Sequence, residues 1–306
     1  MIHVFGHYSP DTDATGSAII WAWYLKEHTG ADATPYVLGE LNSETQFVLE
    51  RFGVPAPAVL ETLTADDQVA IVDTNNPQEL PENISETQIV HIIDHHKLVG
   101  GLSTEAPIDI TIRPAACTAT ILFDLMAIAP ATLPPHIAGV MLSCILSDTL
   151  GFRSPTTTPH DKDIAEQLAA ALNLSVTDFA GELFAAKSDI SAFSDLGLIT
   201  LDSKKYAVGD KNFRVSVLET TNPQAVLERK DGIVAAIKNT IQNETDVDEV
   251  LFFIVDILNE EATVLTYNEL TAQVVAASFG VTVETDTEVL PGIVSRKKQI
   301  LPALTL

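Results

Sequence analysis

Histidine and aspartate side chains follow three short apolar runs near the amino terminus of this chain, in a pattern typical of a metal site. The runs span residues 2–5, 69–72 and 89–93, each of strand length. Parallel strands deliver the residues after them to one crevice at the carboxyl edge of their sheet. Imidazole and carboxylate ligands without a thiolate suit borderline-hard divalent cations such as Mn²⁺ or Co²⁺. The predicted metal ligands are His7, Asp11, Asp13, Asp73, His95 and Asp148.

The charge of this ligand set favours two cations rather than one. Its four carboxylates carry four negative charges, which two divalent cations would cancel. Two such ions, roughly 3.5–4 Å apart, share a bridging water and make hydroxide available near neutral pH for in-line attack on phosphorus. Asp73 stands alone after its own run, and we predict that it bridges the two ions. Because only neutral imidazole coordinates metal, we expect affinity to decline below about pH 6.

Opposite the metals, such a reaction needs cationic hydrogen-bond donors for the charge that develops on the leaving oxygen. The chain has only 17 Lys and Arg side chains, and three of them are adjacent at residues 296–298. Lys204, at the end of a strand-like run, is a further candidate. Lys205 adjoins it, so a slip of one residue would exchange the two, and the sequence leaves both open.

Each pattern also has an ordinary alternative. Asp11 and Asp13 after Pro10 are typical of a turn with a helix cap. Asp73 suits a polar strand end, and residues 296–298 suit a solvated charge run. The joint occurrence of these groups at strand ends favours the metal site.

The first half of the chain alternates strand-length apolar runs with helical periodicity, which predicts βαβ units and a parallel sheet. Predicted strands include residues 69–73 and 89–94. We place Asp148 just beyond the last turn of a buried helix. The predicted helices span residues 17–28, 42–52, 118–128, 136–146, 161–172 and 176–186.

The second half changes character near residues 187–193. Helices are predicted over residues 223–243 and 268–279, with a hairpin at Asn259. Strands are predicted over residues 198–201, 205–208, 213–218 and 250–257. We therefore predict an α/β protein with a parallel-sheet, metal-binding domain over residues 1–188 and a smaller, substrate-gripping α/β domain over residues 193–306.

Composition limits the classes of partner. A formal charge of −25 opposes binding to nucleic acid, but local cations or metals can still hold a small phosphorylated substrate. No apolar run approaches the roughly 20 residues of a membrane-spanning helix, and we see no signal peptide. We expect a cytoplasmic protein without a membrane partner. Cys117 and Cys144 have no paired spacing and are predicted to be buried free thiols.

The triplet Asp94-His95-His96 is the signature of the DHH phosphoesterase superfamily. The chain resembles one branch closely, the family II, manganese-dependent inorganic pyrophosphatases. The matching motifs lie at residues 6–13, 17–18, 72–75, 93–96, 117–121, 147–150, 154–156 and 295–299.

This resemblance implies hydrolysis of inorganic pyrophosphate to two orthophosphates, in a homodimer that holds two Mn²⁺ or Co²⁺ per subunit and receives Mg²⁺ with the substrate. It implies an amino-terminal DHH domain for the metals and a smaller domain that closes over pyrophosphate. One metal would be held by His7, Asp11 and Asp73, and the other by Asp13, Asp73, His95 and Asp148. The phosphates would be held by His96, Lys204, Arg296 and Lys297. The implied catalytic residues are Asp13, Asp73, His96, Arg296 and Lys297.

Three other functions compete. A nanoRNase or single-strand exonuclease shares the metal motifs but has a Gly-rich stretch with a histidine in its second domain, which this chain lacks. A hydrolase of longer polyphosphates and an inactive metal or phosphate sensor are the others. The chain departs from the family pattern at Tyr8, Ala116 and Arg153. None of these is a proposed metal ligand, so we expect any effect to fall on local substrate affinity rather than on activity.

Overall fold

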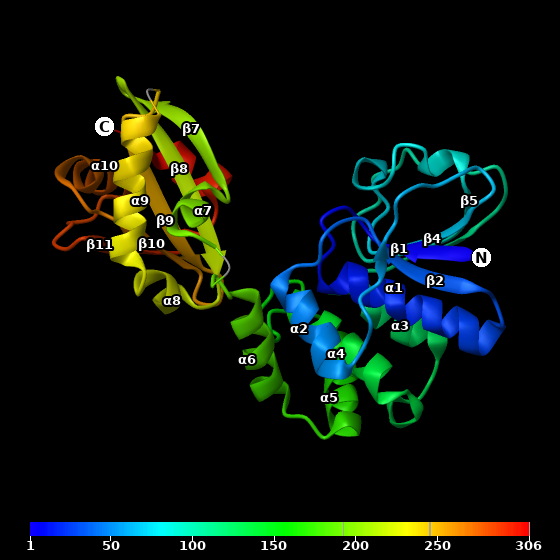
Figure 1. The fold of residues 1–306 in the computed structure, drawn as a ribbon. Helices are drawn as coiled ribbons and strands as arrows, with labels where there is room; N and C mark the ends of the chain where they lie inside the picture. Colours follow the sequence, from blue (N-terminus) through cyan, green and yellow to red (C-terminus); the bar gives the residue numbers. More distant parts are fainter. Residues whose placement is uncertain (192, 245, 306) are drawn as a thin grey trace. The chain divides into compact units, whose positions relative to one another are not determined.

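The computed structural model describes residues 1–191, 193–244 and 246–305, and only the backbone of Lys297 and Lys298. Its chain divides into two compact units, Met1–Ala186 and Lys187–Leu306 (Figure 1). Among the described residues, no single helix is both long and apolar enough to cross a membrane, although one bent pair of helices, Pro159–Leu172 and Val176–Lys187, passes that test by length and composition.

The first unit is built on a six-stranded sheet in which every neighbouring pair is parallel. Its order is β3-β2-β1-β4-β5-β6, so β2, β1, β4 and β5 are interior strands. The three apolar runs form β1, β4 and β5, because interior strands of a parallel sheet are covered on both faces. The predicted parallel sheet is confirmed. The strands are β1 (Ile2–Phe5), β2 (Ala33–Val37), β3 (Ala58–Val59), β4 (Gln68–Val72), β5 (Gln88–Asp94) and β6 (Asp109–Ile112).

Helices of the first unit start and stop at clear local signals. Asn42 caps the second helix by accepting a hydrogen bond from the Thr45 N–H, and Gly53 ends it in a left-handed conformation. Asp148 lies inside the last turn of the fourth helix, so its predicted place beyond that helix was wrong. The helices are α1 (Thr12–Tyr24), continued by a π-helical turn (Leu25–Thr29), α2 (Ser43–Phe52), α3 (Thr118–Met126), α4 (Pro135–Asp148), α5 (Pro159–Leu172) and α6 (Val176–Lys187).

Helices α1 and α4 pack together at a glycine. A Cβ atom on Gly16 would lie 2.3 Å from the Cys144 Sγ and 2.9 Å from a Val140 methyl carbon. Only glycine allows this approach without a shift of these side chains or of one helix. The contact therefore fixes the spacing of the two helices.

We expect Gly16→Ala to lower the free energy of unfolding of the first unit by about 1–3 kcal/mol, the usual cost of overpacking a core. Gly181→Ala is the matched control, because Gly181 lies in α6 with no atom within 4 Å of an added Cβ. That change should raise the free energy of unfolding by about 0.5–1 kcal/mol through helix propensity. Urea unfolding measures both. Equal effects of the two variants would contradict the close packing at Gly16.

The second unit is a five-stranded sheet of order β11-β10-β9-β8-β7, with apolar clusters on both faces. Only β8 and β9 are parallel among its pairs. The strands are β7 (Ser203–Val208), β8 (Lys211–Thr220), β9 (Glu249–Asp256), β10 (Glu261–Leu265) and β11 (Thr287–Pro291). The helices are α7 (Asp195–Thr200), α8 (Pro223–Leu227), α9 (Lys230–Asn243), α10 (Glu269–Phe279) and α11 (Leu301–Ala303), with a π-helical turn at Arg296–Ile300.

Two sequence predictions in this unit were wrong. Residues 198–201 lie mostly in α7, whose cap Ser194 accepts a hydrogen bond from the Gly197 N–H. A four-residue apolar run cannot distinguish a strand from one buried helix face. The single helix predicted over residues 223–243 is two helices, α8 and α9, separated by Glu228 and Arg229.

Candidate metal centre

Asp73 lies directly after β4, and its two carboxylate oxygens face different histidines. Its Oδ2 is 3.4 Å from the His7 Nε2, while its Oδ1 is 3.3 Å from the His95 Nε2. The Thr118 hydroxyl donates a 3.0 Å hydrogen bond to the same Oδ1. Asp73 has a φ of 60°, a left-handed conformation in which aspartate and asparagine are enriched among non-glycine residues. A carboxylate placed in this way can contact two cations at once.

The geometry of Asp11 is compatible with both roles that the sequence suggested as alternatives. Its Oδ1 accepts a 2.9 Å hydrogen bond from the Ala14 N–H and so caps α1. Its Oδ2 lies 3.7 Å from the His7 Nε2. The helix cap therefore orients the second oxygen towards the cluster rather than competing with it.

Asp13 is fully buried against the start of α3. The backbone N–H groups of Thr118 and Ala119 donate to its two oxygens at 2.6 and 3.2 Å, and the Ser17 hydroxyl donates at 2.9 Å. Donors at a helix amino terminus stabilise a carboxylate. Asp148 reaches the same region from α4, with its Oδ2 3.9 Å from the His95 Nε2.

All six predicted ligands lie in three adjoining groups. Within each group the candidate ligand atoms are all within 4.8 Å of one another. Two groups share Asp73, and the contact between His95 and Asp148 links the third to them. The groups are His7, Asp11 and Asp73; Asp73, His95 and His96; and Asp13, Cys117 and Asp148. This donor set of nitrogen and oxygen atoms fits divalent cations such as Mn²⁺.

Two members of these groups, Cys117 and His96, are better assigned to supporting roles. Both cysteines of the chain, Cys117 and Cys144, are free and buried, as predicted. Burial raises the pKa of the Cys117 thiol well above its usual value, so the thiol stays protonated and points to the Asp13 Oδ1 at 3.5 Å. The His96 Nδ1 is 3.8 Å from the Asp73 Oδ1 but is hydrogen-bonded to the Asp94 Oδ1 at 2.9 Å.

The acidic cluster retains protons when no cation is bound. Burial opposes the charged form of His7, but Asp11 and Asp73 outweigh it and raise its pKa to about 11. Burial also opposes the charge on His95, yet hydrogen bonding to Asp73 and the charge of Asp13 raise its pKa to about 9. Burial and the nearby Asp73 charge raise the pKa of Asp13 to about 7. Cations and protons therefore compete for the same side chains.

We expect the apparent Mn²⁺ affinity to rise with pH well above pH 6, beyond the range that the sequence suggested. Metal binding must displace one proton each from His7 and His95, so raising the pH favours the bound state. Between pH 7.5 and 8.5 the logarithm of the affinity should increase with a slope approaching about 2 per pH unit. Free Mn²⁺ measured by electron paramagnetic resonance gives this slope. A flat profile above pH 7.5 would mean that both imidazoles titrate near their ordinary pKa.

Sequence reasoning gave no role to Asp94, Asn75 and Thr118. Asp94 is fully buried, accepts a 2.5 Å hydrogen bond from the Asn75 Nδ2, and holds both the backbone N–H and the Nδ1 of His96. These contacts outweigh burial and lower the pKa of Asp94. The hydrogen bond with Asp94 in turn raises the pKa of His96. The triplet motif was a signal for Asp94, and the motifs at residues 72–75 and 117–121 contain Asn75 and Thr118, but none of them indicated these contacts.

In the second unit, Lys204 and Lys205 have different surroundings. The Lys205 Nζ pairs with Asp246 at 2.8 Å and with Glu244 at 2.9 Å. Adjacent side chains of a strand point to opposite faces, so Lys204 lies on the other face of β7. Arg296 donates to the Asp202 carbonyl at 2.9 Å and pairs with its carboxylate at 2.8 Å, two residues before Lys204. The side chain of Lys297 lies outside the described residues.

Family models match both units. The amino-terminal domain of the DHH family matches residues 1–145, and the DHHA2 domain matches residues 181–306. Together with the parallel sheet and its cluster of histidines and aspartates, these matches define a two-domain protein of the DHH class.

Relatives that match nearly the full chain identify the branch of the DHH class to which it belongs. A Deinococcus radiodurans protein named as a probable manganese-dependent inorganic pyrophosphatase is 40% identical, covering 99% of this chain and 98% of its own. One from Lactobacillus delbrueckii with the same name is 36% identical, covering 99% and 97%. A solved Methanococcus jannaschii structure assigned to the family II inorganic pyrophosphatases is 33% identical, covers 99% and 98%, and superposes with a TM-score of 0.64. The chain belongs to the family of manganese-dependent inorganic pyrophosphatases, which confirms the resemblance.

Proposed function

We propose that this chain hydrolyses inorganic pyrophosphate to two orthophosphates with two divalent cations, Mn²⁺ or Co²⁺, bound in each subunit. The observation that carries the proposal is the placement of Asp73, whose two oxygens face histidines from separate strands. The relatives' names support manganese and pyrophosphate.

The cluster divides into two proposed cation sites around Asp73. His7, Asp11 and Asp73 would hold one cation. The other would be held by Asp13, Asp73, His95 and Asp148. Two cations held there would supply Lewis-acid charge and would lower the pKa of bound water, which is the chemistry that hydrolysis of a phosphoanhydride needs near neutral pH. The helix α3 amino terminus keeps Asp13 oriented for this task through its backbone donors.

Substrate binding is assigned to positively charged side chains of both units. Asp94 fixes the His96 ring and favours its charged form, so its Nε2–H can donate to a phosphate oxygen. Lys204, Arg296 and Lys297 would bind the remaining phosphate oxygens and stabilise charge on the leaving group. The proposed division is a metal-binding domain over residues 1–188 and a substrate-binding domain over residues 193–306.

Family membership supports three further parts of the proposal. Mg²⁺ would enter with pyrophosphate, and the protein would act as a cytoplasmic homodimer. Light scattering measures the oligomeric state. A Mg²⁺ titration at fixed pyrophosphate measures the requirement for Mg²⁺.

The substrate is tested by one comparison on Mn²⁺-loaded protein. Phosphate release is measured from pyrophosphate, tripolyphosphate, a dinucleotide and a nucleoside 3′,5′-bisphosphate. We expect pyrophosphate to give the highest kcat/KM. A preference for either nucleotide would overturn the assignment, and a preference for tripolyphosphate would redirect it to longer phosphate chains.

A further inference from the structure

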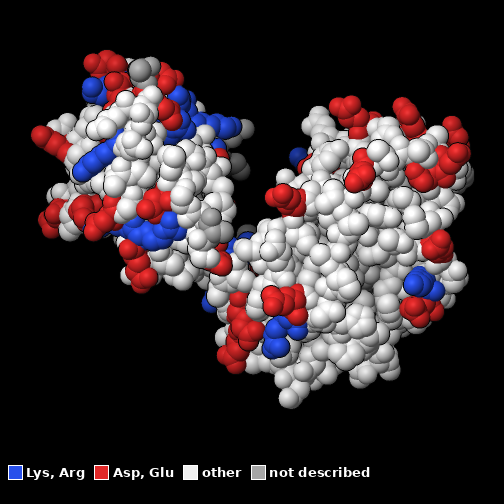
Figure 2. Space-filling view, viewed as in Figure 1, with Lys and Arg blue, Asp and Glu red and all other residues white. Residues whose placement is uncertain are grey.

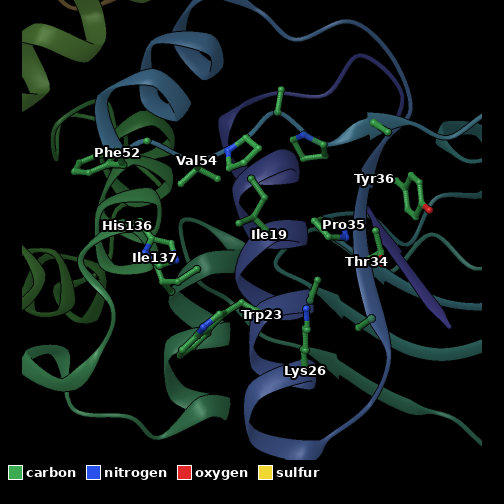
Figure 3. Close-up of a pocket in the computed structure, with 17 residues that line it drawn as sticks. Ile19, Trp23, Lys26, Thr34, Pro35, Tyr36, Phe52, Val54, His136 and Ile137 are labelled. Atoms are coloured by element: carbon green, nitrogen blue, oxygen red, sulfur yellow. The ribbon is translucent and has the colours of Figure 1, made fainter.

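A cavity of about 730 Å³ opens in the first unit beside α1 (Figure 3). It is open to solvent on one side and is bordered by α1 with the π-helical turn after it, β2, residues 53–58 and the first turn of α4. None of its lining residues is a proposed metal ligand or phosphate contact. Ile19 is the lining residue nearest to Asp13 along α1, and it lies six positions beyond Asp13, about 9 Å along the helix axis. The cavity is therefore separate from the metal centre.

Its walls are held in place by packing that does not depend on a ligand. Ile19, Ala22 and Ile137 form a floor that is itself buried. Phe52 rests on Gly139 of α4, where an added Cβ would lie 2.3 Å from the ring, and its edge meets Phe179 with ring centres 5.6 Å apart.

Two prolines stiffen the opposite wall. Pro55 and Pro57 lie in the loop after α2, and each proline ring fixes its backbone φ. Ligand sites are usually preformed, apolar cavities of about 300–1,000 Å³ with a few polar groups. The volume, the lining and the rigid walls of this cavity all fit that description.

The charge of the lining differs from that of the chain. The chain carries 42 Asp and Glu against 17 Lys and Arg, yet among the described residues no carboxylate lines the cavity. Lys26 and His136 do line it, together with the aromatic rings of Trp23 and Phe52. On the face seen in Figure 2, the acidic side chains of this unit gather mainly at its margins. A negative group is therefore best accommodated beside Lys26.

We propose that this cavity binds a small amphiphilic anion, with an apolar, ring-containing body and one carboxylate, sulfonate or phosphate group that pairs with Lys26. The body packs against the aromatic rings and the buried aliphatic floor. Lys26 selects the charged end.

A matched pair of fluorescent probes tests the proposal on the full-length, Mn²⁺-loaded chain. The probe 8-anilinonaphthalene-1-sulfonate has the required body and charge, and N-phenyl-1-naphthylamine has the same body without the sulfonate. We expect the sulfonate to bind saturably at one equivalent per chain. Lys26→Gln should weaken it about threefold to fivefold, as for an exposed ion pair, and leave the neutral probe unchanged.

Two further variants separate this cavity from other apolar surfaces. Lys162→Gln is the matched control, because Lys162 lies in α5 outside the cavity. It should bind both probes like the unmodified chain. Trp23→Leu removes an aromatic wall and should weaken both probes about tenfold. Unsaturable binding, equal sulfonate affinity of the two lysine variants, or unchanged affinity of Trp23→Leu would each overturn the proposal.

Discussion

Replacing Asp73 with asparagine is expected to abolish pyrophosphate hydrolysis and to reduce binding of both cations. The substitution keeps the shape of the side chain and suits the left-handed backbone at this position. It replaces one of the two oxygens that face His7 and His95 and removes the shared negative charge. Loss of a group that only supports a metal ligand costs roughly 10–100-fold in metal affinity or activity. We expect a loss of more than about 100-fold for this bridging ligand.

The measurement pairs turnover with bound Mn²⁺ per chain. Asp66→Asn is the matched control, because Asp66 is exposed and outside the cluster. It should retain both metals and normal turnover. Near-normal activity of Asp73→Asn would show that Asp73 does not bridge two cations.

Arg296→Ala is expected to impair substrate use while leaving metal content unchanged. Truncating one partner of a desolvated charge contact costs about 2–5 kcal/mol. At about 1.36 kcal/mol for each factor of ten, the expected loss in kcat/KM is roughly thirtyfold to several thousandfold. The proposed metal ligands all lie in the first unit, so Mn²⁺ binding should not change.

Lys205→Gln provides the matched control for a cation in the same unit. Lys205 is already paired with Glu244 and Asp246, so its loss should change kcat/KM less than about threefold. If Arg296→Ala lowered the number of bound Mn²⁺ instead, the proposed division of labour between the two domains would be wrong.

Much of the first unit could be predicted because its strands are short apolar runs that end in polar side chains. The pattern of these runs alone is enough to place His7, Asp73 and His95 at one sheet edge. β2 and β6 were missed because they are partly polar, and β2 contains Pro35. Helix α7 was mistaken for a strand because Leu198 and Ile199 give no period in so short a run.

Contacts between distant segments could not be predicted. The Thr118 N–H that donates to Asp13 lies 105 residues away in the chain, and nothing local to either residue indicates the pairing. The sequence likewise could not distinguish Lys204 from Lys205 as the substrate contact. The ion pair that engages Lys205 is with Glu244, and a strand pattern does not reveal such a partner. The apolar cavity beside α1 combines α2, β2 and α4, so no single periodic segment signals it.

The wide spacing of the cluster along the chain has a consequence for its biosynthesis. The proposed ligands extend from His7 in the loop after β1 to Asp148 at the end of α4. A nascent polypeptide on the ribosome lacks the complete set of these side chains until α4 has emerged. Binding of two cations by all six side chains would therefore follow the assembly of the first unit. The bound cations would then stabilise it, since a ligand that binds the native state alone adds to its stability.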